Sequence, residues 1–256
     1  MKTKDEARLA VMDQVVGCTN CELHSQCLGP VPFHGPTPTE LVVLGEAPGK
    51  EEDEQCQPFI GRAGQMMRKH LRRIGMDDQK VTYINTASCF PHGTPEKEHI
   101  EACADNKRAQ LDLADPQFVL VVGKTALFGQ RPGVEFKRVR GSVFKDDAGR
   151  INFVTYHPSA ALRNGNFEKT MGEDLDLFAE LLRGERTWPT LIADRCTVCG
   201  RWPDGEMGEM IDPDTALNYC EAHAPEHVAN QLRLWRRSID ERIHFEKNPH
   251  QQAFAS

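Results

Sequence analysis

The sequence predicts an α/β fold, a three-layer sandwich with a central parallel sheet of about four strands, followed by a small C-terminal module stapled by metal. Short apolar runs that stop at glycine or a polar residue alternate with segments of helical periodicity. This alternation is typical of a parallel sheet with helices on both faces. Near residue 188 the composition changes to tryptophan, proline and closely spaced cysteines. We therefore expect two domains, residues 1–187 and 188–256.

The elements of the first domain are expected in a regular order. The apolar run Leu41–Leu44 stops at Gly45, as a buried parallel strand does before its loop. The most apolar run, residues 118–122, stops at Gly123 in the same way. The full expected order is a helix over 5–16, a connector over 29–38, a strand over 41–44, a helix over 65–74, a strand over 81–87, a helix over 95–113, a strand over 118–122, a helix beginning over 125–128, a strand over 151–156, a helix over 174–182 and, in the second domain, a helix over 229–243.

Chemically active side chains stand where the expected strands end. The loop after the first strand, GEAPGKEEDEQCQPFIGRAG, carries the carboxylates of Glu46 and Glu52 and the ring of Phe59. Asn85 and His157 stand at the ends of two further strands, where α/β folds place ligand contacts. Together these groups suit a pocket for a planar, polar ligand. The alternative is a set of ordinary loops with solvated acids, a core aromatic, a turn asparagine and a loop histidine.

Composition and charge narrow the class of protein. The chain has 256 residues, 39% of them hydrophobic, and no apolar run approaches the roughly 20 residues of a membrane helix. The first residues lack the apolar stretch of a signal peptide, so we expect a cytoplasmic protein with no membrane partner. The net charge of −7 weighs mildly against a nucleic-acid partner. Basic clusters over residues 68–73 and 137–140 suit either a phosphate backbone or a solvated face.

Two sets of cysteines suggest metal, since closely spaced pairs in a reducing compartment favour metal over disulfides. In the second domain, two ligand pairs separated by about 20 residues meet the demand of a tetrahedral Cys3His zinc site. This zinc module is either purely structural or a knuckle that binds nucleic acid or a partner. In the first domain, four thiols suit an iron–sulfur cluster, zinc, or plain reduced cysteines. The first set is Cys18, Cys21, Cys89 and Cys103, and the second is Cys196, Cys199, Cys220 and His223.

The motifs together resemble a known family. GEAPG, an acid six residues after Glu46, PF-x-G-x-AG, the asparagine at a strand end and His157-Pro158-Ser159-Ala160 resemble the uracil-DNA glycosylase superfamily, most closely its iron–sulfur branch, family 4. The resemblance covers residues 18–182. It implies a monomeric DNA-repair hydrolase that flips uracil out of DNA, cleaves its N-glycosidic bond and leaves an abasic site, associated with the nucleoid when bound to DNA. It also assigns a 4Fe–4S cluster to the first cysteine set, leaving Cys27 and Cys56 spare.

The resemblance assigns a role to each site residue. Phe59 would stack on uracil, the Asn85 amide would pair with O4 and N3–H, and His157 would donate to O2. Glu46 would orient the attacking water, and Glu52 would crowd the 5-carbon and exclude thymine. Ala47 would take part in substrate binding. The DNA-binding loop would contain Ser159, Leu162 as a wedge and Arg163 as a phosphate contact.

The sequence departs from the family after Cys89. The loop CFPHGTPEKEHIEAC is shorter than usual and lacks the family's Asn-Arg pair, which contacts DNA or supports the site. A non-catalytic nucleic-acid-binding protein on the same fold is therefore the alternative function. An enzyme of free nucleotides would need a phosphate-cradling glycine loop, and none with the expected spacing is present.

Overall fold

The computed structural model describes residues 3–134, 136–185, 191–192, 209–211 and 218–219. Contacts divide the chain into two compact units, Met1–Trp188 and Pro189–Ser256. In the second unit, three short strands pair antiparallel in the order β6-β7-β8: Leu191–Ile192, Glu209–Ile211 and Asn218–Tyr219. The expected zinc ligands and the helix over 229–243 lie outside the described residues.

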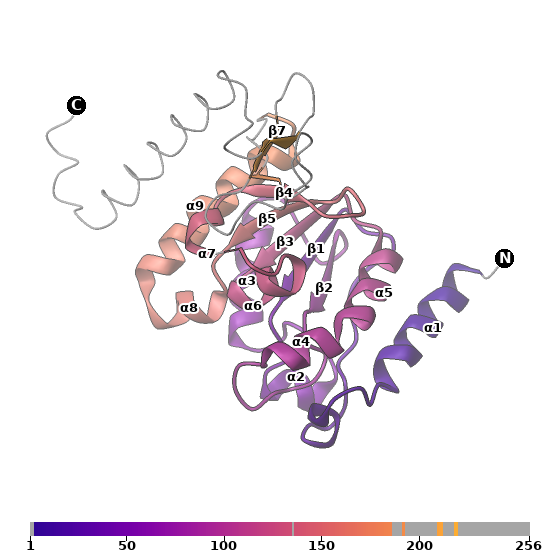
Figure 1. The fold of residues 1–256 in the computed structure, drawn as a ribbon. Coiled ribbons are helices and arrows are strands. Elements are labelled where there is room, and N and C mark those ends of the chain that lie inside the picture. Colours follow the sequence, from indigo (N-terminus) through magenta and orange to yellow (C-terminus); the bar gives the residue numbers. More distant parts are fainter. Residues whose placement is uncertain (1–2, 135, 186–190, 193–208, 212–217, 220–256) are drawn as a thin grey trace, which may run out of the picture. The chain divides into compact units, whose positions relative to one another are not determined.

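A five-stranded sheet forms the centre of the first unit (Figure 1). Its order is β2-β1-β3-β5-β4, and the first four strands pair parallel. The prediction of a parallel α/β sheet is confirmed. The fifth strand, β4, was not predicted, because three residues that run antiparallel to β5 are too short to show a period. The strands are β1 Leu41–Gly45, β2 Val81–Asn85, β3 Phe118–Val122, β4 Val143–Lys145 and β5 Ile151–Thr155.

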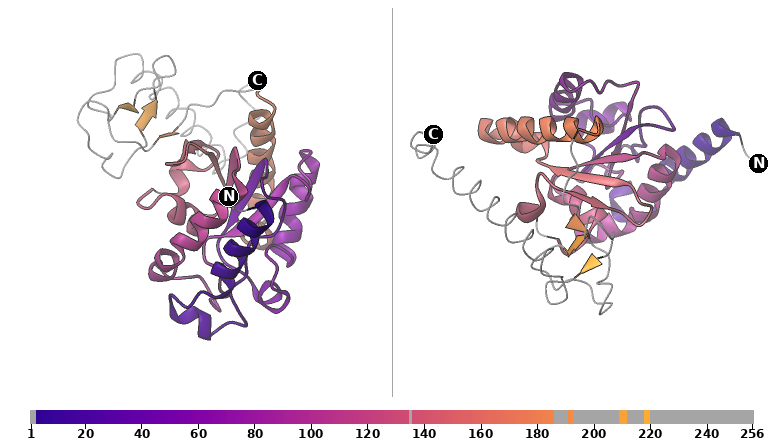
Figure 2. Two further views of the ribbon diagram at one scale, coloured as in Figure 1. Left: turned by 90° about the vertical axis from the view of Figure 1, so that its right-hand side faces the viewer. Right: turned by 90° about the horizontal axis from the view of Figure 1, so that it is seen from above.

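Helices cover both faces of this sheet (Figure 2). On one face α3, α8 and α9 pack together, and the apolar stripes of α3 and α9 meet alternate strand residues in a single buried core. On the other face α6 contacts β1 and β3, and α5 contacts α1, α4 and β2. The helices are α1 Lys4–Val16, the 3-10 turn η1 Glu22–Ser25, α2 Lys50–Gln55, α3 Arg62–Arg73, α4 Lys97–Ala102, α5 Ala104–Ala114, α6 Lys124–Gln130, α7 Phe136–Val139, α8 Pro158–Arg163 and α9 Gly165–Leu182.

Two of the expected helices differ most from their predicted bounds. The helix expected over 95–113 is two helices that meet at Cys103. The helix expected over 174–182 begins at Gly165 instead, because the Asn164 side chain accepts from the Asn166 N–H and caps it. Glycines 165 and 172 had hidden this first half from a propensity argument. In the described part of the chain, no helix has the length and apolar character to cross a membrane.

The two edges of the large sheet are β2 and β4. Beside β2, the connector residue His34 forms an antiparallel bridge with Tyr83, with N···O distances of 3.0 and 2.8 Å. At the other edge, β4 ends at the exposed residue Lys145. The hydrophobic core lies between these edges. The carboxyl ends of the four parallel strands carry the candidate functional residues.

Candidate active site

The site lies at the carboxyl ends of the parallel strands. Parallel strands present these ends at one edge of a sheet. Glu46 follows β1, Asn85 ends β2 in register with Gly45, and His157 comes two residues after β5. Three chain segments distant in sequence therefore meet at one edge.

Gly45 is the point where the aromatic and amide groups come together. A Cβ atom at Gly45 would lie 2.4 Å from Asn85 Oδ1 and 2.6 Å from Phe59 Cζ. Both side chains are 6% exposed. A glycine is required here because any side chain would displace both groups. The Asn85 amide and the Phe59 ring thus both lie against Gly45, at the end of β1.

The backbone of Phe59 is strained, and neighbouring contacts hold it in place. Phe59 has φ of +60°, in the left-handed region that non-glycine residues rarely adopt. Its carbonyl accepts from Arg68 Nε at 3.1 Å, and Gly64 lies so close that a Cβ there would be 2.1 Å from the same oxygen. The ring packs against Tyr83 with 5.2 Å between centroids. Such strain persists where surrounding contacts impose it, and it is common at functional sites.

The two carboxylates of the pocket loop have different partners. Glu46 is half-buried, and its Oε2 accepts from the Thr125 hydroxyl at 2.6 Å. Both oxygens of Glu52 accept backbone N–H groups, one from Gly49 at 3.1 Å and one from Gly61 at 2.9 Å. Glu52 therefore joins the GEAPG segment to the segment that carries Phe59. This bracing contact was not foreseen from the sequence.

The hydrogen bonds of His157 define which ring nitrogen carries the proton. Burial, and secondarily the charge of Arg163, lowers the pKa of His157 to about 4, so the ring is neutral at neutral pH. Its Nδ1 accepts from the Ser159 N–H at 3.2 Å and lies 2.7 Å from Ser159 Oγ. A neutral ring with Nδ1 as acceptor carries its proton on Nε2. The imidazole is thus a donor that does not carry a charge.

A buried polar network supports the strand that delivers His157. Asp174 on α9 is 2% exposed and accepts from the Thr155 hydroxyl at 2.7 Å. The same carboxylate pairs with Arg140, whose guanidinium lies 5.4 Å from the Tyr156 ring centroid. The last residue of β5 is therefore tied to α9. Sequence analysis missed Asp174, which lies within a helix, and Thr125, which follows the end of β3 but stands in no motif.

The thiols of the first cysteine set are neighbours in the fold. Cys89 and Cys103 are buried, and Cys18 and Cys21 are half-buried. Burial raises the pKa of the Cys89 thiol, and neighbouring thiols, including Cys27 and Cys103, add to the rise. Burial likewise raises the pKa of Cys103, with smaller contributions from Cys21 and Cys18. Among the described residues, no three His, Cys, Asp or Glu side chains stand at metal-binding geometry. The donor type and number still fit an iron–sulfur cluster.

Polar contacts hold the cysteine-bearing segments together. His99 Nε2 lies 2.7 Å from a Glu22 carboxylate oxygen, and His92 Nε2 lies 2.8 Å from the Gln26 carbonyl. The Leu28 N–H donates to the carboxylate of Asp53, at 3.1 Å from each oxygen. The short loop after Cys89 is therefore fastened to the N-terminal segment.

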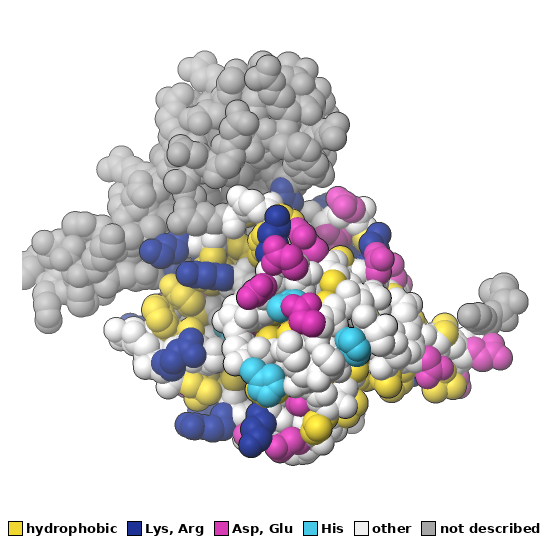
Figure 3. Space-filling view, turned by 60° about the horizontal axis from the view of Figure 1, so that its bottom comes forward, with side chains coloured by type: hydrophobic (Ala, Val, Ile, Leu, Met, Phe, Trp, Pro, Cys, Tyr) yellow, Lys and Arg dark blue, Asp and Glu magenta, His cyan; other side chains and the backbone are white. Residues whose placement is uncertain are grey.

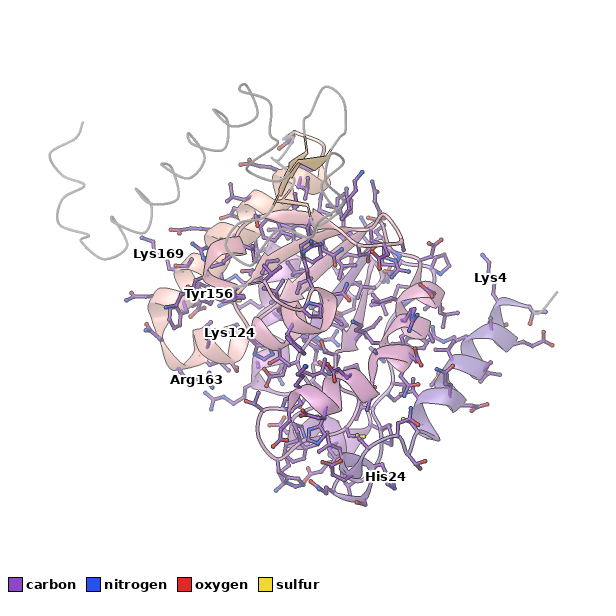
Figure 4. All side chains as sticks on the ribbon, in the orientation of Figure 1. Lys4, His24, Lys124, Tyr156, Arg163 and Lys169 are labelled. Atoms are coloured by element: carbon purple, nitrogen blue, oxygen red, sulfur yellow. The ribbon has the colours of Figure 1, made fainter. Side chains whose placement is uncertain are left out.

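The expected DNA-binding residues lie on α8. Leu162 is 40% exposed, and Phe167 beyond it is 36% exposed. Lys124, Tyr156, Arg163 and Lys169 lie on the same side of the molecule (Figure 4). In Figure 3, lysine and arginine side chains gather over one side of the face shown, and acidic side chains gather over its middle and opposite side. Basic side chains beside exposed apolar ones on this side can contact a phosphate backbone and an adjacent base step of DNA.

Comparison with known proteins agrees with this arrangement. The sequence model of the uracil DNA glycosylase superfamily matches residues 32–181, more than half of the chain, and the chain belongs to this superfamily. Its relatives include the type-4 uracil-DNA glycosylase of Thermotoga maritima, 33% identical over 191 residues, covering 72% of this chain and 100% of the relative. The type-4 enzymes of Sulfurisphaera tokodaii and Archaeoglobus fulgidus are 32% and 29% identical, covering 67% and 71% of this chain and 83% and 96% of those proteins. The resemblance inferred from the motifs is confirmed.

Proposed function

We propose that this protein is a DNA-repair hydrolase that removes uracil from DNA by cleaving the N-glycosidic bond and leaves an abasic site. The observation that carries the proposal is the meeting of Phe59, Asn85 and Gly45 at the sheet edge that also holds Glu46 and His157. Relatives named type-4 uracil-DNA glycosylase, of which this chain covers most of the length, support it.

The pocket groups suit recognition of a base taken out of the duplex. An enzyme that acts on a base must extrude it from the stack and read its edge in a pocket. The Phe59 ring offers a face for stacking. The Asn85 amide offers one acceptor and one donor group, which match N3–H and O4 of uracil but not the edge of cytosine. Glu52 acts on this pocket through the two loops that it joins.

His157 and Glu46 divide the chemical work. When the bond between base and sugar breaks, negative charge develops on uracil O2 and positive charge on the sugar. The Nε2–H of neutral His157 donates to O2 without protonating the base, and a donor preorganised in a dry site contributes several kcal/mol of transition-state stabilisation. The half-buried Glu46 carboxylate orients the attacking water and stabilises the cationic sugar. Ala47 lines the base pocket beside it.

The rim of α8 supplies the DNA contacts. Leu162 enters the minor groove as a wedge where the base leaves, and Arg163 and Ser159 contact the adjacent backbone. Inserted apolar residues of this kind unstack base steps in many DNA complexes. The Leu162 side chain is 40% exposed, so it is accessible for such a contact.

Metal has a structural task in this proposal. Cys18, Cys21, Cys89 and Cys103 hold a 4Fe–4S cluster that cross-links the N-terminal segment to the loop and helix after β2. In the second unit a zinc ion links Cys196, Cys199, Cys220 and His223, on the evidence of their spacing alone.

The test is an excision assay with wild-type protein prepared without oxygen. Oligonucleotides with one uracil, single- and double-stranded, are incubated with the protein, and abasic sites are revealed by alkaline cleavage. We expect cleavage at the uracil and none in matched strands that carry thymine or cytosine. Binding without cleavage on every substrate would instead support the non-catalytic nucleic-acid-binding protein that the shortened loop after Cys89 suggests.

A further inference from the structure

Thr125 makes a contact with Glu46 that no motif predicts. Its Oγ1 lies 2.6 Å from Glu46 Oε2, and because an ionised carboxylate only accepts, the hydroxyl donates. Thr125 is 8% exposed, so water competes little for this bond. A hydrogen bond to a charged group is short and about twice as strong as one between neutral groups.

The support beneath Thr125 is rigid. Thr125 is the second residue of α6, which begins directly after β3 and packs against β1 and β3. The next two residues, Ala126 and Leu127, are buried. Gly123, just before the helix, has φ of +93° and lies so close to His157 that a Cβ there would be 2.8 Å from the His157 Cβ. The segment from Gly123 to Thr125 therefore contacts both residues proposed to do the chemistry, His157 through Gly123 and Glu46 through Thr125.

The contact leaves one carboxylate oxygen for the reaction. Among the described residues, Thr125 is the one side chain with a hydrogen bond to the Glu46 carboxylate, and it occupies Oε2. A carboxylate anchored through one oxygen presents the other in a defined direction. Holding a reactant in such a near-attack geometry is a large source of rate enhancement.

We propose that Thr125 is a positioning residue for hydrolysis, which holds Glu46 through Oε2 so that Oε1 directs the attacking water at C1′ of the deoxyribose. The water oxygen forms a bond to C1′ while the bond from C1′ to uracil N1 breaks, and its electron pair leaves with the base. The water proton passes to Oε1 and on to solvent, and the departed base takes a proton from solvent. This inference rests on the proposed uracil excision.

The experiment compares isosteric variants in single-turnover excision. Thr125→Val keeps the shape and removes the donor, and we expect the rate to fall about 10- to 100-fold with unchanged affinity for uracil DNA. Thr125→Ser keeps the donor and should restore most of the rate. In a Glu46→Gln background, adding Thr125→Val should cause no further loss, since the threonine acts only through that carboxylate.

A matched control separates positioning from folding. Thr82 on β2 is also buried, and its hydroxyl donates to the Pro36 carbonyl, away from the carboxyl ends of the strands where the site lies. Thr82→Val should lower the melting temperature and leave the excision rate unchanged. A wild-type rate in Thr125→Val, a Ser variant as slow as the Val variant, or losses that multiply with Glu46→Gln would each overturn the inference. Wild-type protein that leaves uracil in place would overturn the proposed function, and the inference with it.

Discussion

Adding one methyl group at Gly45 should block the proposed pocket while leaving the fold in place. In Gly45→Ala the new Cβ would lie 2.4 Å from Asn85 Oδ1 and 2.6 Å from Phe59 Cζ. Ordinary contacts are about 3.5 Å, so both groups must retreat by about 1 Å. A misplacement of about 1 Å costs roughly 100-fold in rate. The atoms that move are side-chain tips, so the cost of overpacking is about 1–3 kcal/mol in the free energy of unfolding.

The assay measures single-turnover excision of uracil together with denaturant unfolding. Gly29→Ala is the matched control, because a Cβ there would have open space around it. We expect Gly29→Ala to match the wild type in both measurements and Gly45→Ala to lose excision while it still unfolds cooperatively. A Gly45→Ala protein that excises uracil at the wild-type rate would show that Phe59 and Asn85 do not hold the base at this point.

Three further predictions concern other parts of the site. His157→Ala should slow single-turnover excision by roughly 10²–10³-fold with little change in DNA affinity. The pKa of His157 is lowered to about 4 in the folded protein, so the free energy of unfolding of the wild type should fall by about 3 kcal/mol as the pH falls from about 6.5 towards 4. A His157→Gln protein with the same pH dependence in urea titrations would refute the pH prediction. Glu52→Ala removes the acceptor for the N–H groups of Gly49 and Gly61, so uracil excision should fall. The same change removes the side chain that the family resemblance places against the 5-carbon, so weak thymine excision should emerge. Unchanged activity on both bases would exclude both the bracing role and the thymine-excluding role of Glu52. Protein prepared without oxygen should be brown, and Cys103→Ser should bleach it; iron analysis that finds equal iron in the two proteins would argue against Cys103 as a ligand.

The parallel strands could be predicted because the signal for each lies within a few consecutive residues. Each is a continuous apolar run ended by glycine or a polar residue, and the observed bounds differ from the expected ones by at most two residues. The start of α9 was not predictable, because it depends on a cap at Asn164 that only three-dimensional geometry reveals. The same holds for the break at Cys103, which lies within a continuous helical pattern.

The site residues likewise fall into those that a local sequence pattern predicts and those that it does not. Asn85 and His157 could be predicted from their place at strand ends, and the structure brings Asn85 together with Phe59. Thr125 and Asp174 could not, because neither a threonine in the first turn of a helix nor an acid within a helix has a pattern that distinguishes it. Their roles arise from the packing of α6 beside β1 and of α9 beside β5, and that packing depends on contacts between segments far apart in the chain.

The borders of the large sheet bear on how the protein behaves when concentrated. An open strand edge is a template on which another molecule can add a strand, and this is how many aggregates begin. Here the bridge from His34 occupies backbone groups of Tyr83 on the outer side of β2, and β4 is three residues long and ends in an exposed lysine. Both borders are therefore poor templates. Aggregation should accordingly start from a local release of the 29–38 connector rather than from global unfolding, and a substitution that loosens this connector would lower solubility before it lowers the melting temperature.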